Sequence, residues 1–488
     1  MRFWLLLTLS IVLTACSGGP SNAPVNVVLI GDADDMEESS GRLSDTDLYV
    51  RSASAEGLVA FGASGEIVPA LAERWIITDD GLSYIFRLRN SDWPSGDVIT
   101  GGEIRARLLS AVTQAENTSL GYDLAKITEI REMTGRVIEI RLASPMPGFL
   151  RLLAQPELGL LKDGKGAGPM VSDEDEDNAV VGLLALSPET RGLPALRDWE
   201  DTVRPIMLRA LPAQAAVDAF SSGDADVVLN GKIESFPSAD LGPLSRGNIR
   251  LDASLGLFGL IALNEDGVLS EAPLRQALVM AIDRESLMEP FNIGGWLPSN
   301  TAVPSEMWSD IVPAEPAWSA LALEDRRARA RSRIAAWTAS SGEKPVVTIG
   351  MPPGPGSVQL YRRIEADFAA IGVTTSLVSA GKPADLELFD RTARFASPRW
   401  FLNQFNCDIQ DGPCAVIADD LVVQSLTETN AKLKAEMLAR AELALEDAAI
   451  FIPFGAPIRW SLVRSDVTGF EENPWGIHPL FPLSGAPI

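Results

Sequence analysis

Between residues 63 and 164 the apolar positions mostly recur at every second residue. Residues 82–88 alternate apolar and polar side chains, which is typical of a half-buried strand, and residues 78–81 supply a turn from the strand before them. Residues 137–142 alternate in the same way, whereas the apolar positions within 104–112 have helical spacing. This pattern predicts a small unit of antiparallel strands with helices.

From residue 205 onwards, strand-like and helix-like stretches alternate. Two strand–helix–strand units follow one another: 205–211, 213–221 and 227–230, then 346–350, 357–371 and 374–378. Units of this kind imply parallel strands joined by right-handed crossovers. A further helix at 430–447 leads into a strand at 450–454. The predicted fold class is therefore mixed α/β with two or three lobes.

The charge and the rare residue types narrow the class of function. Among 488 residues, 66 are acidic and 41 are basic, which gives a formal net charge of −25. Such a surface excludes a general nucleic-acid binder, whose affinity comes largely from Lys and Arg on phosphates. One histidine and three cysteines argue against a zinc or copper site and against a His-based catalytic triad. We expect no metal and no cofactor.

The first residues resemble a bacterial lipoprotein signal. A short basic start is followed by an apolar run from Phe3 to Val12, too short to span a bilayer, and then by the sequence LTAC ending at Cys16. The resemblance implies that residues 1–15 are removed, that Cys16 is lipidated, and that residues 16–23 form a tether. An ordinary secretory signal is the alternative. Either interpretation places the protein in the periplasm or cell envelope, and the first makes it membrane-anchored.

The two remaining cysteines, Cys407 and Cys414, form an even pair that an oxidising compartment would join. We expect a disulfide that clamps a loop. A catalytic redox role is disfavoured, because the spacing is not C-x-x-C and no basic residue lies between the two cysteines to lower a thiol pKa.

Several segments, spread over most of the chain, resemble one protein family. They are AEGLV at 55–59, GEIVPALAERW at 65–75, DDGLSYIFRLR at 79–89, SDWPSG at 91–96, GAGP at 166–169, SSGDAD at 221–226 and PLRQALVMAIDR at 273–284. In this order they are similar to the bacterial extracellular solute-binding proteins of family 5, the dipeptide, oligopeptide and nickel receptors of ABC importers. The similarity is weakest at about 380–430.

This resemblance implies a periplasmic-binding-protein-like fold with two lobes and an inserted subdomain. Lobe I would comprise 24–62, 165–257 and 453–488, the inserted α+β subdomain 63–164, and lobe II 258–452, with hinge crossings near 257 and 453. The expected mechanism is closure of the lobes on a peptide or related solute, which a separate permease and ATPase would then import. We expect a monomer.

Ligands of open α/β sheets bind beyond the carboxyl ends of the strands, so three loops are candidates: 31–40, 350–356 and 390–401. The last contains four residues suited to an anionic group, namely Arg391, Arg394, Arg399 and Trp400. We expect at least one of these arginines to face the cleft, although pairing with surface acids is an equal alternative. In the first loop, Glu37 and Glu38 could meet a cation, although a location on the surface is the favoured alternative.

The same segment departs from the family pattern. Peptide receptors of the family carry an aspartate there that grips the ligand's amino group, and only Asp390 in the sequence FDRTARFASP could replace it. Recognition of a free amino terminus is therefore in doubt, which leaves room for an anionic, blocked or non-peptide ligand. His478 is expected to be structural.

Two other functions stay open. The divergence at 380–430, and Ser17 after the expected lipidated cysteine, are compatible with a lipoprotein that keeps the fold for sensing, scaffolding or chaperoning. A periplasmic hydrolase is disfavoured, because the sequence carries a lone histidine and no nucleophile motif.

Overall fold

The computed structural model describes residues 23–31, 43–175, 180–239, 247–308, 311, 313 and 315–486. Cys16, Glu38 and the expected leader lie outside these residues, as does most of the tether. Within the described part of the chain, no helix combines the length and the apolar character needed to cross a bilayer.

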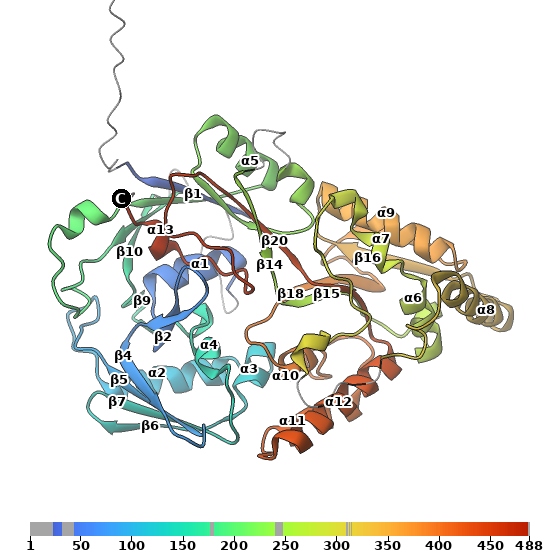
Figure 1. The fold of residues 1–488 in the computed structure, drawn as a ribbon, viewed down its shortest axis with the longest axis horizontal. Helices are drawn as coiled ribbons and strands as arrows, with labels where there is room; N and C mark the ends of the chain where they lie inside the picture. The colour runs from blue at the N-terminus through green and yellow to red at the C-terminus, as the bar shows by residue number, and fades with distance from the viewer. Residues whose placement is uncertain are drawn as a thin grey trace, which may run out of the picture.

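A seven-stranded mixed sheet forms the first lobe (Figure 1). Its strands, in spatial order, are β10 (Met170–Asp175), β11 (Val180–Ala185), β12 (Ile206–Leu211), β1 (Val25–Ile30), β13 (Val227–Gly231), β20 (Ile458–Val463) and β14 (Ile249–Ala253). The first predicted crossover is present, but its two strands are not neighbours, because β1 lies between them and pairs in parallel with both. β1 is apolar except at Asn26, because both of its faces are buried: Val27 packs in one core with α1 (Asp45–Ser54), and Val28 in another with α5 (Ala213–Ser222).

A five-stranded sheet forms the second lobe. Its order is β17 (Thr374–Ser379), β16 (Val346–Met351), β18 (Leu386–Thr392), β15 (Gly256–Ala262) and β19 (Phe451–Gly455). The second predicted crossover is confirmed, since β16 and β17 pair in parallel and α9 (Pro355–Ala369) connects them. Helices α6 (Ala272–Ala281) and α8 (Leu323–Ser341) share the apolar core of this sheet.

The predicted antiparallel unit is a separate four-stranded sheet, the inserted unit. Its strands are β4 (Ala72–Ile77), β5 (Ser83–Leu88), β7 (Val137–Leu142) and β6 (Ile127–Thr134), and its helices are α2 (Gly101–Gln114), α3 (Ser119–Leu124) and α4 (Phe149–Leu153). The remaining short elements include β2 (Val59–Phe61), β3 (Ile67–Pro69), β8 (Leu161–Lys162), β9 (Lys165–Gly166), α7 (Arg284–Leu287) and α13 (Leu480–Leu483).

Two short links join the large sheets. Residues 254–255 connect β14 to β15, and residues 456–457 connect β19 to β20, where Trp296 Nε1 donates a hydrogen bond of 2.8 Å to the Ala456 carbonyl. Away from these links, α10 (Pro398–Asn403), α11 (Val416–Ser425) and α12 (Ala431–Ala448) of the second lobe lie beside the inserted unit (Figure 1). The second lobe is therefore connected to the rest of the molecule in two places, at the two links and at the contact of these three helices with the inserted unit.

Candidate ligand-binding site

A cavity of about 330 Å³ lies between the two large sheets, and both lobes contribute to its wall. The first lobe provides residues of α1, of β13 and of β20, together with the stretch 476–479. The second lobe provides the end of β18 and part of α10. A short 3-10 helix, Pro156–Leu158, completes the wall from the side of the inserted unit.

Three of the four residues predicted in the segment 390–401 line this cavity: Arg391, Arg394 and Trp400. Arg391 donates a hydrogen bond of 3.1 Å to Gln404 Oε1, and its guanidinium lies 4.2 Å from the centre of the Phe389 ring. The segment is more regular than a loop, because β18 continues to Thr392 and α10 begins at Pro398. Trp400 is buried and packs edge-on against Phe401.

Arg399 lies elsewhere. It sits in the first turn of α10, where its side chain is 3% exposed and points toward α3 of the inserted unit. Its two terminal nitrogens donate to the backbone carbonyls of Tyr122 and Asp123, at 2.8 and 2.9 Å. Arg399 is not among the residues of the cavity wall. It therefore contributes to packing between the second lobe and the inserted unit, which are called the two bodies.

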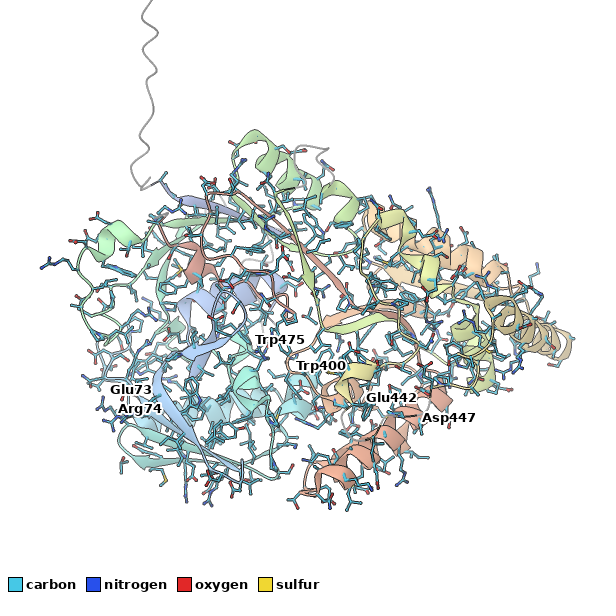
Figure 2. All side chains as sticks on the ribbon, in the orientation of Figure 1. Glu73, Arg74, Trp400, Glu442, Asp447 and Trp475 are labelled. Atoms are coloured by element: carbon cyan, nitrogen blue, oxygen red, sulfur yellow. A yellow bond between two sulfur atoms is a disulfide. The ribbon has the colours of Figure 1, made fainter. Side chains whose placement is uncertain are left out.

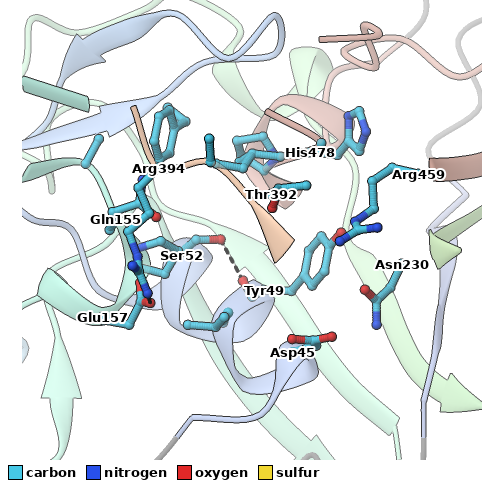
Figure 3. Close-up of a pocket in the computed structure, with 18 of the residues that line it drawn as sticks. Asp45, Tyr49, Ser52, Gln155, Glu157, Asn230, Thr392, Arg394, Arg459 and His478 are labelled. Carbon is cyan, nitrogen blue, oxygen red and sulfur yellow. Dashed lines mark hydrogen bonds and ion pairs between the residues drawn. The ribbon is translucent and has the colours of Figure 1, made fainter. Parts of the chain in front are cut away.

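Arg394 has acidic partners on the inserted unit. One Nη donates to Asp123 Oδ2 at 3.0 Å, and the other lies 3.9 Å from Glu157 Oε1. Figure 3 shows Arg394 close to Glu157 and Gln155, on one side of the cavity. The guanidinium is thus held at the wall by groups from outside its own lobe.

Asp390, the residue expected to bind an amino group, is paired within the protein. Arg459 of β20 lies 2.7 Å from its carboxylate, and both side chains are 11% exposed. Burial lowers the pKa of Arg459, but Asp390, together with the nearby Glu234 and Asp45, raises it above its ordinary value, so the arginine stays charged. An incoming ammonium group would have to compete with this guanidinium for the carboxylate.

Sequence reasoning missed four polar residues of the first lobe that line the cavity, which are Asp45, Asn230, Lys232 and Arg459. Asp45 forms an ion pair with Lys232, and although burial raises the Asp45 pKa, Lys232 and Arg459 lower it below its usual value. Asn230 and Lys232 follow the rule used for the other loops, because they lie at the carboxyl end of the parallel strand β13. That signal was present in the sequence. Asp45 and Arg459 carried no comparable one.

His478 also borders the cavity but is held by the protein. Its Nε2 lies 2.9 Å from Asp252 Oδ2, and its ring stacks on Phe470 with the ring centres 4.3 Å apart. The other oxygen of Asp252 accepts the backbone N–H of Asn473 at 2.9 Å. These contacts suit a histidine that fixes the carboxyl-terminal segment.

The other two candidate loops, 31–40 and 350–356, contribute little to the described part of the site. The loop 350–356 packs against the backbone of Ile233 and Glu234, so closely that a Cβ on Gly356 would overlap the Ile233 carbonyl. It contributes no residue to the described wall of the cavity. Apart from Gly31, nearly all of the loop 31–40, including Glu38, lies outside the described residues.

The sulfur atoms of Cys407 and Cys414 are bonded, with their Cα atoms 5.3 Å apart. They close a short loop after α10, in the region that adjoins the inserted unit.

The wall suits reversible binding of a small polar solute. It carries charges of both signs, and its volume is near the lower end of the 300–1,000 Å³ usual for small-molecule clefts. Among the described residues, no group of three or more His, Cys, Asp or Glu side chains could hold a metal ion. Two lobes joined by two links, with a polar cavity between them, define a two-lobed solute-binding protein.

The comparison with known families agrees with this class. The model described as bacterial extracellular solute-binding proteins, family 5 (middle region), matches residues 66–181 and 201–408, more than half of the chain. The chain therefore belongs to this family, whose members are receptors outside the cytoplasm.

Individual proteins support the assignment over nearly the whole chain. A probable di/tripeptide-binding protein 5 from Pseudomonas aeruginosa is 24% identical over 487 aligned residues, which cover 86% of this chain and 87% of that protein. Among solved structures, the OppA protein of Haemophilus influenzae in complex with the peptide RPPGFSPFR has a TM-score of 0.80 at 17% identity, covering 96% of this chain and 100% of that one.

The murein tripeptide binding protein MppA of Escherichia coli matches with a TM-score of 0.78 at 18% identity, over 96% of this chain and 99% of that chain. Its unliganded open form, over 96% and 98%, scores only 0.62. The predicted two-lobed α/β fold is confirmed.

Proposed function

We propose that this protein is the receptor of an ABC importer that binds a solute the size of a di- or tripeptide and delivers it to a membrane permease. The observation that carries the proposal is the polar cavity of about 330 Å³ between the lobes, because a site of this size holds a small ligand and both lobes can contact it. The similarity to di/tripeptide-binding proteins supports the same ligand class.

Arg391 and Arg394 are the residues proposed to bind an anionic group of the ligand, such as a peptide carboxylate. Both line the cavity near the end of β18, and a guanidinium can bind a carboxylate through two parallel hydrogen bonds. Trp400 would offer an apolar surface beside them. Glu38 remains a proposed contact for a cationic group.

The pairing of Asp390 with Arg459 bears on the opposite end of the ligand. Because the Asp390 carboxylate already has a guanidinium partner at 2.7 Å, we propose that a free amino terminus is not bound by Asp390 alone. Ligands with blocked or free amino ends should then differ less in affinity than they do in a receptor with an unpaired aspartate at this position.

The first test is to purify the protein gently from its native envelope and to identify by mass spectrometry what denaturation releases. Small peptides in stoichiometric amount would support the proposal and would show whether their amino termini are free. Titration calorimetry with Ala-Ala, N-acetyl-Ala-Ala and Ala-Ala-amide would follow. Absence of binding by all three, together with no co-purified solute, would count against a peptide receptor.

We further propose that Cys16 is lipidated and that the mature protein is a monomer anchored to a membrane of the bacterial cell envelope, in the periplasm. The support is the LTAC sequence after a short apolar run. Metabolic labelling with a fatty-acid analogue should mark the wild-type protein. The Cys16→Ser variant should carry no label and should leave the membrane fraction.

A further inference from the structure

Helix α3 of the inserted unit is held by side chains of the second lobe. Arg399 donates to the Tyr122 and Asp123 carbonyls, at 2.8 and 2.9 Å. At the edge of the contact, the Tyr122 hydroxyl donates to Asp408 Oδ2 at 2.7 Å. These contacts between α3 and the second lobe, together with those of the Asp123 side chain, form what we call the α3 clasp.

The centre of the clasp is a buried carboxylate. Asp123 has no exposed surface; its Oδ2 accepts from Arg394 at 3.0 Å, and its Oδ1 accepts from Asn403 at 2.9 Å. Both donors, Arg394 and Asn403, belong to the second lobe. A buried carboxylate without partners is costly, so these contacts make the docking of α3 specific to this arrangement of the lobes.

The same Arg394 guanidinium lines the ligand cavity. The hydrogen bonds that hold it both come from α3, since Asp123 Oδ2 accepts at 3.0 Å and Ser119 Oγ at 3.2 Å, whereas the second acid beside it, Glu157, is 3.9 Å away, beyond hydrogen-bonding distance. One arginine thus takes part both in the contact between the bodies and in the wall of the cavity. The two events that involve it, docking of α3 and binding of a ligand, share a structural element.

We propose that Asp123 is a positioning residue that places Arg394 in the ligand cavity only when α3 has docked on the second lobe, and that it thereby couples closure of the lobes to ligand binding. The inference rests on the proposed ligand site but concerns how that site is assembled. When the bodies separate, Arg394 loses its closest acidic partner, and the cavity loses a fixed cation.

The consequence is a difference in affinity between two states. A ligand shifts an equilibrium only by as much as it binds one state better than the other. In the closed state the ligand would meet an arginine already oriented by Asp123, whereas in an open state it would have to immobilise a mobile side chain. By reciprocity, the clasp strengthens ligand binding by the same factor as the ligand strengthens the clasp.

The test compares the wild type with Asp123→Asn, which keeps the shape of the side chain and removes its charge. Calorimetry and stopped-flow kinetics with Ala-Ala would give Kd and the dissociation rate, and small-angle scattering the radius of gyration. Hydrogen exchange of the amides in 119–124 would report docking of α3. The proposal predicts a Kd raised about tenfold or more, mostly through faster dissociation, and reduced α3 protection with saturating Ala-Ala.

A matched control is Asp367→Asn. Asp367 is another buried aspartate paired with an arginine, Arg327, but both residues lie within the second lobe. This variant should lower the melting temperature while leaving Kd and α3 protection unchanged. If Asp123→Asn behaved in the same way as this control, Asp123 would be merely structural and the proposal would be overturned.

Two further variants keep the test decisive. Should Asp123→Asn not fold, Tyr122→Phe removes only the exposed hydroxyl contact with Asp408 and should weaken α3 protection and raise Kd in a smaller but parallel way; protection and Kd both equal to wild type would overturn the proposal. Arg394→Lys should restore part of the affinity lost in Arg394→Ala.

Failure of the ligand proposal would be recognised separately. If wild type does not bind Ala-Ala, the ligand class is wrong, and α3 exchange in the presence of the solute released from the native protein then tests the clasp. Less protection in Asp123→Asn or Tyr122→Phe than in wild type would support it, and equal protection would overturn it.

Discussion

Arg459 and Asp390 belong to different sheets, and their side chains meet at 2.7 Å beside the cavity. The pair joins β20 of the first lobe to β18 of the second, close to the two links between the lobes. It therefore ties the lobes together on the inner side of the cavity, as the α3 clasp does on the outer side.

Removing one member of this pair should destabilise the protein more than removing both. Arg459→Met leaves the mostly buried Asp390 without its counter-charge and should cost about 3–5 kcal/mol in free energy of unfolding. The double variant Arg459→Met/Asp390→Asn should recover a large part of that loss. Urea unfolding of the four proteins in the cycle measures the coupling.

The exposed pair of Arg87 and Glu73 provides the control, since these side chains are 43% and 38% exposed. Arg87→Met should cost less than about 1 kcal/mol. A similar small loss in Arg459→Met would contradict a buried, interacting pair.

Arg391→Ala should weaken binding of ligands that carry a carboxylate. We expect wild type to prefer Ala-Ala over Ala-Ala-amide, because guanidinium groups recognise the carboxylate. The variant should lose about tenfold in affinity for the free acid and little for the amide, which corresponds to about 1.4 kcal/mol. Calorimetry with both ligands is the measurement. A preference for the acid unchanged in both Arg391→Ala and Arg394→Ala would exclude these arginines as its source.

The pH dependence of stability should reflect two carboxyl groups on α12. Burial raises the pKa of Glu442 to about 7, and burial together with the Glu442 charge raises that of Glu446 to about 8. Between their ordinary pKa and these values the folded protein holds protons that the unfolded chain has released. Their stabilising contribution is therefore complete below about pH 4.5 and is lost as the pH rises through 7 to 8.

Glu446→Gln should flatten this dependence in melting temperatures recorded from pH 5 to 9. Figure 2 places Glu442 on α12, on the side of the second lobe. An exposed glutamate in the same lobe, Glu343, gives the control variant Glu343→Gln, whose profile should match wild type. Identical slopes in all three proteins would rule out the buried carboxyl as the origin.

Reduction of the Cys407–Cys414 bond should lower stability modestly. The two cysteines are only 7 positions apart, and closing so short a loop removes little entropy from the unfolded chain. The expected loss in free energy of unfolding is about 2 kcal/mol. Urea midpoints with and without reductant would show the loss, and Cys407→Ser should be insensitive to reductant. An equal effect of reductant on wild type and variant would point to another cause.

The fold could be predicted from the sequence more completely than the ligand-binding site. The period of two at residues 82–88 depends on local packing, and the strand predicted there is present as β5. Arg391 and Arg394 could be placed at the cavity because β18 runs into it. Arg399 could not be excluded, since only the start of α10 at Pro398 turns that side chain toward α3.

Other parts of the site depend on distant segments meeting. Arg459 reaches Asp390 from a strand 69 positions later in the chain, and Asp45 reaches Lys232 from a helix of the same lobe. Nothing in the local sequence of either acid indicates its partner. Lys232 follows a predicted parallel strand and could have been proposed by the rule applied to the other loops.

The largest apolar core contains residues from both the inserted unit and the second lobe, among them Phe149 and Phe395. The inserted unit and the second lobe pack closely here, because a Cβ added to Gly148 would lie only 2.8 Å from the Cβ of Phe395. Separating the two bodies must bring part of this surface into water. Closure should therefore carry a negative heat-capacity change, and the measured enthalpy of ligand binding should become more favourable with increasing temperature.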